Sequence, residues 1–328
     1  MKNYSLTSYF LIAVSTRENL ELCRKYSLAG FPSSIMGAWA FCDIRQGDRV
    51  SFLYGARVYD LYIVMEKYLE YDEKAPPPWK PLEFGSGKRR RRYFYPFRLR
   101  LKPLRIFNEP LTRIEFSYVA ENLLLRGGYR KTHFQADRID LGYASKLGVV
   151  VDNADIQDSI NSSSSSELKF TFNKSKVDLP KIFPFREQIL HAALRHYLSD
   201  EKKLEQFLTG LSIILSQETQ WEVLGEKALP EGYVDILIKE AVPTGLSRKI
   251  IVEVKRGEAT TRDFQQLKAY RKEFGEECIG AVLIAKRINK KLRRKFPEIK
   301  VVEYSIEGLA DVFTFRELVN AIKIHMPE

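Results

Sequence analysis

Gly232-Tyr233-Val234-Asp235-Ile236-Leu237-Ile238 is followed, after a polar turn, by Lys249-Ile250-Ile251-Val252-Glu253-Val254-Lys255-Arg256-Gly257. Both runs are rich in β-branched residues, so they predict two adjacent strands joined by a loop. Because side chains alternate along a strand, Glu253 and Lys255 fall on one face of the second strand, together with Ile251. A carboxylate and an ammonium thus share one face of a largely apolar strand.

These charges favour a site for phosphodiester hydrolysis. Asp235 lies in the neighbouring strand, where its carboxylate can meet Glu253 and Lys255. Two carboxylates beside an ammonium are what a hard divalent cation and a scissile phosphate require. A Glu-x-Lys pair alone is most simply a solvated or cross-strand ion pair. The second carboxylate, Asp235, therefore favours a catalytic site over that simpler interpretation.

Two motifs resemble those of the PD-(D/E)XK nuclease superfamily. Asp235 followed by Glu253-Val254-Lys255 has the strand placement of its degenerate motif, and Gln266 and Tyr270 resemble the QxxxY element of its RecB-like and NucS-like branch. The spacing of Gln266 and Tyr270 puts both on one face of a helix predicted over Asp263–Phe274. The resemblance implies that these two residues steady the site or the DNA backbone.

The same resemblance implies a magnesium cofactor, for which Mn²⁺ would substitute. Asp235, Glu253 and the carbonyl of Val254 would hold the metal ion, which lowers the pKa of the attacking water. Lys255 would orient that water or stabilise the charge of the transition state. The implied activity is that of a Mg²⁺-dependent endodeoxyribonuclease.

A further acid is implied on the helix predicted over Ser199–Leu215, which has an apolar stripe. Its run Leu204-Glu205-Gln206-Phe207-Leu208 resembles the helix that carries an additional catalytic glutamate in NucS-like enzymes. This implies a catalytic role for Glu205, and Glu201 and Glu226 are the alternatives.

The remaining C-terminal segments fit an α/β core with a mixed sheet flanked by helices. A helix is predicted over Phe185–Leu198, strands over Ile279–Ala285 and Lys300–Tyr304, and a closing helix over Leu309–Ile322. His191 and His196 lie five residues apart on the first helix, so they do not share a face and are expected to be packing or surface residues.

Length, charge and cysteine content bound the function. The 328 residues suffice for two domains, and the 45% apolar content supports hydrophobic cores. The net charge of +11 indicates a polyanionic partner. The sequence offers neither a basic amphipathic helix nor an apolar run of transmembrane length, so we expect no membrane partner and a cytoplasmic location. The widely spaced Cys23, Cys42 and Cys278 argue against zinc and disulfides.

The first 150 residues predict a small, mostly β domain with one helix, which Thr16 caps and which ends near Gly30. Four segments resemble the EVE domain, a member of the PUA-like group that also includes YTH: Tyr9-Phe10, Asn19, Gly47-Asp48-Arg49-Val50-Ser51-Phe52 and Tyr95-Pro96-Phe97-Arg98. The resemblance implies a PUA-like small β-barrel with helices that holds a modified base in an aromatic pocket.

Such a pocket is physically reasonable, because a flipped base offers two π-faces for stacking and an added methyl group fills an apolar gap. The expected pocket residues are Phe31, Ser33, Ser34, Trp39, Tyr54 and Trp79. A single aromatic on a strand is usually a core residue, but we expect at least two of these four aromatics to contact the base. 5-Methylcytosine, 5-hydroxymethylcytosine and N6-methyladenine all suit it, and the resemblance favours cytosine.

Two basic clusters are expected to contact the DNA backbone. They contain Arg89, Arg90, Arg91 and Arg92, after a Gly-Ser-Gly loop, and Lys290, Arg293 and Arg294, after the predicted strand at Ile279–Ala285. The alternative for each cluster is a solvated loop or helix face.

Together these features predict an α+β chain of two domains. Residues 1–150 would form the EVE/PUA-like reader, 151–180 a serine-rich linker, and 181–328 the PD-(D/E)XK nuclease domain. The function predicted is a modification-dependent endonuclease that binds double-stranded DNA carrying a modified base and acts as a homodimer for double-strand cleavage. The alternatives are a NucS-like nuclease for mismatched or branched DNA and a non-catalytic RNA-binding PUA-like protein.

Overall fold

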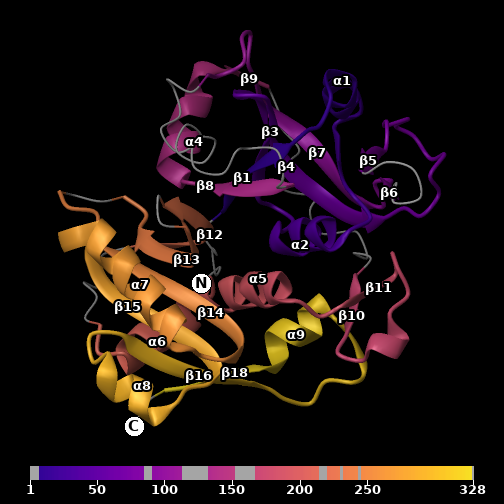
Figure 1. Cartoon of the computed structure of the whole chain (residues 1–328). Helices are drawn as coiled ribbons and strands as arrows, with labels where there is room; N and C mark the ends of the chain where they lie inside the picture. The colour runs from indigo at the N-terminus through magenta and orange to yellow at the C-terminus, as the bar shows by residue number, and fades with distance from the viewer. Residues whose placement is uncertain are drawn as a thin grey trace. The chain divides into compact units, whose positions relative to one another are not determined.

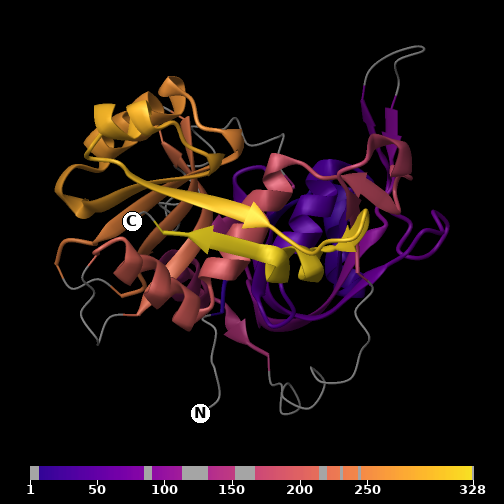
Figure 2. The ribbon, with the colours of Figure 1, turned by 90° about the horizontal axis from the view of Figure 1, so that it is seen from below.

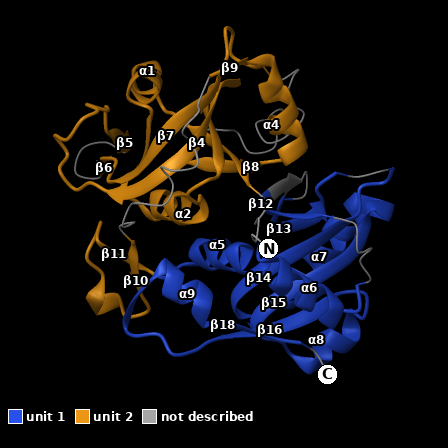
Figure 3. Cartoon of the chain, turned by 180° about the vertical axis from the view of Figure 1, so that it is seen from behind, with its two compact units in different colours: residues 1–6, 185–328 blue, residues 7–184 orange. Residues whose placement is uncertain are grey.

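The computed structural model describes residues 7–84, 91–112, 132–151, 167–213, 220–229, 232–242 and 245–326. It is a mixed α/β structure that divides into two compact units between Pro184 and Phe185 (Figure 3). We call residues 7–184 the N-terminal unit and residues 185–328 the C-terminal unit. Part of the linker predicted over 151–180 lies outside the described residues, whereas residues 167–180 belong to the N-terminal unit.

The N-terminal unit is built on one large sheet with the strand order β2-β7-β4-β3-β1-β8, with β9 paired to β7. Strands β1 and β3 run parallel, and β1 pairs antiparallel with β8. Its helices and strands are β1 (Tyr9–Ala13), α1 (Arg17–Tyr26), β2 (Leu28–Phe31), α2 (Ile35–Asp43), β3 (Arg49–Tyr54), β4 (Arg57–Leu69), β5 (Leu82–Phe84), β6 (Arg91–Tyr93), β7 (Phe97–Ile106), β8 (His133–Ala136), α4 (Arg138–Ala144), β9 (Val149–Val150), β10 (Lys169–Thr171) and β11 (Ile182–Pro184).

Side-chain caps explain where the first two helices begin. Thr16 caps α1 by accepting a hydrogen bond from the N–H of Asn19 at 3.1 Å, as its sequence predicts. Ser34 caps α2 in the same way, accepting from Gly37. The prediction of a single helix in this domain missed α2, and α1 ends at Tyr26, where Ser27 adopts a left-handed conformation (φ 48°), rather than near Gly30.

The C-terminal unit is built on a six-stranded sheet with the order β12-β13-β14-β15-β16-β18 (Figure 1). Strands β14, β15 and β16 are parallel, and the other neighbours are antiparallel; Figure 2 shows β16 and β18 running in opposite directions. Its helices and strands are α5 (Glu187–Leu198), α6 (Glu201–Gly210), β12 (Trp221–Leu229), β13 (Gly232–Glu240), β14 (Lys249–Glu258), α7 (Thr261–Phe274), β15 (Cys278–Arg287), α8 (Lys290–Lys295), β16 (Lys300–Ile306), β17 (Val312–Thr314), α9 (Phe315–Ala321) and β18 (Ile322–His325).

Helix α7 covers one face of this sheet. Its buried residues Phe264, Leu267 and Tyr270 share an apolar cluster with Leu237 of β13 and Ile251 of β14. Burial of this kind contributes about 25 cal/mol per Å² of apolar surface, so α7 is anchored firmly over the two strands that carry the predicted acids.

The closing helix is shorter than the sequence predicted. Instead of a helix over Leu309–Ile322, the chain forms β17 and then α9, which begins after Thr314. Thr314 and Glu317 make a reciprocal capping box, which fixes the start of the helix.

Within the part of the chain that the structure describes, no helix is long and apolar enough to span a membrane.

Candidate active site

The two carboxylates and the lysine predicted from the sequence lie together where β13 and β14 leave their common ladder. The last backbone pair between these strands joins Ile236 to Val252. Beyond it, Asp235 Oδ2 accepts a hydrogen bond from the N–H of Val254 at 2.7 Å. On β14, Lys255 Nζ lies 2.8 Å from Glu253 Oε1. Strand pairing therefore brings the acid of one strand to the acid and lysine of the next.

Glu253 is buried to an unusual degree for a carboxylate, with 1% of its surface exposed. Burial, followed by the negative charge of Asp235, raises the pKa of Glu253 to about 8, although Lys255 opposes the shift. Burial disfavours the ammonium of Lys255 as well, but Glu253 and Asp235 outweigh it and raise the pKa of Lys255. The cluster thus holds two carboxylates against one ammonium, and a proton or a cation on Glu253 relieves the excess negative charge.

The carboxylates fit a magnesium ion. Glu253 Oε2 is buried and has no hydrogen-bond partner among the described residues. A buried carboxylate oxygen without a donor is costly unless a cation binds it. The same part of the structure holds no group of three or more His, Cys, Asp or Glu side chains placed to bind a metal ion. Two carboxylates nevertheless suffice for Mg²⁺, which keeps several waters and takes further ligands from substrate phosphates.

Gln266 and Tyr270 lie beside this cluster and contact each other. Gln266 Nε2 donates to Tyr270 Oη at 2.6 Å. Burial, with smaller contributions from Glu253 and Asp235, raises the pKa of Tyr270. A Cβ placed on Gly232, whose φ is +145°, would lie 2.5 Å from Tyr270 Oη. Only glycine therefore lets the tyrosine hydroxyl approach the start of β13 this closely.

Helix α5 supplies an acid near Lys255, Glu187, whereas Glu205 of α6 makes no contact with the cluster among the described residues. Glu187 Oε2 accepts a hydrogen bond from the N–H of Arg256 at 3.1 Å, and its charge contributes to the raised pKa of Lys255. Glu205 is exposed, and no hydrogen bond or ion pair joins it to the cluster in the described chain. Glu187, and not Glu205, is thus the helix glutamate that the structure brings to the backbone next to Lys255, and the catalytic role of an additional glutamate stays a prediction.

Two further residues at the site were missed by the sequence analysis. His191, one helical turn after Glu187, is buried, as expected for a packing residue, and its Nδ1 lies 3.5 Å from Asp235 Oδ1. Asp263, in the first turn of α7, lies 3.8 Å from Lys255 Nζ. His196 packs edge-on against Phe315, as expected for a packing residue.

The basic residues of α8 come directly after β15, the strand that pairs with Lys255 of β14. Lys255 is paired with Ala285 of β15, and Glu258 with Arg287 at the end of that strand. Lys290 and Arg294 on α8 are exposed and Arg293 is half-buried.

The second basic cluster predicted to contact DNA is Arg89 to Arg92 in the N-terminal unit. Arg91 is exposed, and Arg92 forms an ion pair with Glu73 at 2.5 Å. Arg89 and Arg90 lie outside the described residues.

The residues expected to form the base pocket are distributed between core and surface. Phe31 and Trp39 are core residues, with exposures of 1% and 4%, and Trp39 packs edge-on against His133. Tyr54 and Trp79 are half-buried, and the Trp79 ring lies directly on Gly30. Phe31 and Trp39 therefore present no open ring face for stacking on a base.

The two serines have backbone roles. The Ser34 side chain caps α2, and the N–H of Ser33 donates to the carbonyl of Phe94 at 2.8 Å.

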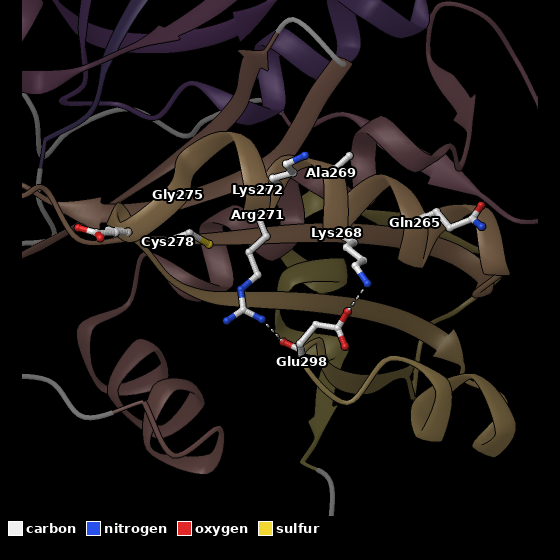
Figure 4. Close-up of a pocket in the computed structure, with 9 residues that line it drawn as sticks. Gln265, Lys268, Ala269, Arg271, Lys272, Gly275, Cys278 and Glu298 are labelled. Atoms are coloured by element: carbon white, nitrogen blue, oxygen red, sulfur yellow. Dashed lines mark hydrogen bonds and ion pairs between the residues drawn. The ribbon is translucent and has the colours of Figure 1, made fainter.

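A separate hollow of about 730 Å³ lies along the second half of α7. Figure 4 shows Lys268 and Arg271 reaching from this helix to Glu298, at 3.3 Å from its carboxylate and 3.0 Å from its carbonyl respectively. Cys278 also lines the hollow. None of the site residues predicted from the sequence lines the hollow. Its lining includes three basic residues and two glutamates, and one of these glutamates, Glu298, is in contact with Lys268 and Arg271, so the hollow differs from the paired carboxylates of the candidate active site.

No protein-family model matches the chain, and no curated protein matches it. Several solved structures are similar to it at low identity. The EndoMS–dsDNA2 complex is 12% identical, with 90% of this chain and 96% of that chain covered and a TM-score of 0.22. The DNA modification-dependent restriction endonuclease AspBHI is 9% identical, with 95% and 71% covered and a TM-score of 0.19. The MspJI restriction endonuclease in complex with a 27-mer oligonucleotide is 11% identical, with 88% and 64% covered and a TM-score of 0.18.

TM-scores of this size do not establish a common fold. The proposed function therefore rests on the side chains of the candidate active site.

Proposed function

We propose that the chain is a Mg²⁺-dependent DNA endonuclease of the PD-(D/E)XK type, whose N-terminal unit is an EVE/PUA-like reader of a modified base. The observation that carries the nuclease assignment is the buried Glu253 carboxylate beside Asp235 and Lys255, whose Oε2 has no donor within the described segments of the chain. A structural ion pair would satisfy both oxygens, whereas a metal site leaves one for the cation.

Asp235 and Glu253, with the carbonyl of Val254, would hold Mg²⁺, and Mn²⁺ would substitute for it. The bound metal ion would supply a water of lowered pKa and charge stabilisation for the phosphate. Lys255, held protonated by the two carboxylates, would orient the attacking water or neutralise charge on the phosphate. His191 would keep Asp235 oriented, and the Gln266–Tyr270 pair would support the side of the site that α7 forms.

The double-stranded DNA substrate would approach along the basic edge that α8 forms. Lys290 and Arg294 are exposed there, on the helix that follows the strand paired with Lys255. Phosphate contacts of this kind contribute affinity without sequence preference. Because one site hydrolyses one phosphodiester, cleavage of both strands would require a homodimer.

The reading of a modified base is proposed for the N-terminal unit on its resemblance to EVE domains. Among the aromatic residues predicted for the pocket, Tyr54 and Trp79 are partly exposed, whereas Phe31 and Trp39 are buried, so we assign stacking on the flipped base to Tyr54 and Trp79. 5-Methylcytosine and 5-hydroxymethylcytosine are the favoured bases, followed by N6-methyladenine.

The test is Mg²⁺-dependent cleavage of matched duplexes that are unmodified, carry one of the three modified bases, or contain a single mismatch. We expect cleavage of one modified duplex, its loss in Asp235→Ala with DNA binding retained, and normal cleavage by Glu205→Gln, the matched control. Cleavage of the mismatch alone would instead support a mismatch nuclease. Full cleavage by Asp235→Ala would disprove the assigned site.

A further inference from the structure

The backbone immediately after Lys255 departs from the regular ladder of the sheet. β14 pairs with β15 up to Lys255, and the pairing resumes at Glu258 after a shift in register. Arg256 and Gly257, which lie between them, are exposed. A Cβ built on Gly257 would meet no atom within 4 Å. Side-chain packing around Gly257 therefore does little to hold the segment that follows the lysine.

Two side chains from other elements bind both backbone groups of Arg256. Glu187 Oε2 of α5 accepts from the N–H of Arg256 at 3.1 Å, and Tyr304 Oη of β16 donates to its carbonyl at 3.0 Å. The Arg256 guanidinium also donates to the carbonyl of Phe185 at 3.0 Å. Backbone groups outside a ladder must find other partners, and here two side chains fix the peptide groups on both sides of Arg256.

The Tyr304 hydroxyl is suited to this task. Tyr304 is buried, with 3% of its surface exposed. Burial, followed by the negative charge of Glu187, raises the pKa of Tyr304 to about 12, so its hydroxyl remains a donor at neutral pH. Lys255 directly precedes the clamped residue, and its ammonium lies 2.8 Å from Glu253 and 3.8 Å from Asp263.

We propose that Tyr304 is a positioning residue that, together with Glu187, clamps the peptide groups of Arg256 and thereby holds the Lys255 ammonium against Glu253. For its kinetic consequence the inference rests on the proposed nuclease function. Loss of the hydroxyl would let residues 255–258 shift, and a catalytic group displaced by about 1 Å can lower the rate by roughly 10²-fold.

Tyr304→Phe tests the clamp because it removes one oxygen and keeps the buried ring. Single-turnover cleavage of the modified duplex should slow by about 10-fold to 100-fold, while the DNA Kd, measured with Ca²⁺ in place of Mg²⁺, and the melting temperature stay close to the parent values. Tyr197→Phe is the matched control, because it removes the same oxygen from a tyrosine of α5. It keeps the ring, whose centre lies 4.4 Å from Lys203 Nζ. It should cleave at the parent rate.

A second measurement does not depend on cleavage. Amide hydrogen exchange at Arg256 and Gly257 should be faster in Tyr304→Phe than in the parent and unchanged in Tyr197→Phe. If the parent cleaves DNA and Tyr304→Phe cleaves equally fast, the positioning role is overturned. If the parent cleaves no duplex, the proposed function fails instead, and unchanged amide exchange in Tyr304→Phe would then overturn the clamp itself.

Discussion

At the scale of single residues, the site combines groups that stabilise the fold poorly but suit chemistry. A carboxylate as buried as Glu253 costs free energy in the folded state, since burial and Asp235 both favour its protonated form. The ammonium of Lys255 opposes this shift of the Glu253 pKa without cancelling it, while the hydrogen bond from Val254 stabilises the neighbouring Asp235. Such a cost is typical of functional sites, where charged groups are retained for binding or catalysis.

The first prediction concerns the metal. Because Mg²⁺ would bind the folded site and not the unfolded chain, it should raise the melting temperature of the parent. At 100 times its Kd, the added free energy of unfolding is about 2.7 kcal/mol. Glu253→Gln removes the charge that attracts the cation while keeping the shape of the side chain, so it should abolish the shift. Differential scanning fluorimetry with and without Mg²⁺ measures this, and Glu205→Gln, which should retain the full shift, is the control.

The second prediction concerns Lys67 in β4, which is half-buried, binds the carbonyl of Ile44 and lies 4.7 Å from the ring centre of Phe41. Burial lowers the pKa of Lys67 from 10.5 to about 8. Between these values the unfolded chain binds more protons than the folded one, so this lysine makes the N-terminal unit more stable as the pH rises from about 8 to 10.5.

Lys67→Met removes the ammonium, so the variant should lack the gain in stability that Lys67 contributes between about pH 8 and 10.5. The difference in melting temperature, variant minus parent, should be more positive at pH 7 than at pH 10. Lys25→Met, at an exposed lysine of α1, should show the same difference from the parent at both pH values. A Lys67→Met difference that does not change with pH would show that the ammonium is not desolvated in the fold.

At the scale of secondary-structure elements, the third prediction concerns α8. Replacing the exposed Lys290 and Arg294 by Gln should weaken DNA binding equally for modified and unmodified duplexes. For every phosphate that the variant no longer neutralises, the slope of log K against log salt should become shallower by about 0.9. Lys174→Gln with Lys176→Gln makes the same charge change at two exposed residues of the N-terminal unit. If this control pair has the same effect, net charge and not α8 explains the binding.

The strands and their acids could be predicted from the sequence because alternation fixes which residues share a face, and the i, i+4 rule placed Gln266 beside Tyr270. Glu187 was not among the acids proposed from the sequence, which were Glu205, Glu201 and Glu226, because only tertiary packing determines which helix end reaches Lys255. Helix α2 was missed because every residue from Gly37 to Asp43 is buried, which leaves no helical periodicity to detect.

At the scale of the whole molecule, the division between Pro184 and Phe185 separates the proposed reader from the proposed nuclease. The carboxylate cluster belongs to the C-terminal unit, as do the neighbouring Glu187, His191 and Asp263. Tyr54 and Trp79 belong to the N-terminal unit. The two properties, choice of the base and hydrolysis of the bond, should therefore respond to different substitutions.

The last prediction uses this separation. Tyr54→Ala removes a half-buried ring at the end of β3, where it would stack on the flipped base. We expect the ratio of cleavage rates for modified over unmodified duplex to fall towards one, from a parent ratio between about 10 and 200, the range that one methyl group in an apolar pocket supports. Tyr26→Ala, at an exposed tyrosine of the same unit, should leave the ratio unchanged. If Tyr54→Ala instead slows both duplexes equally, Tyr54 supports binding or folding and does not read the base.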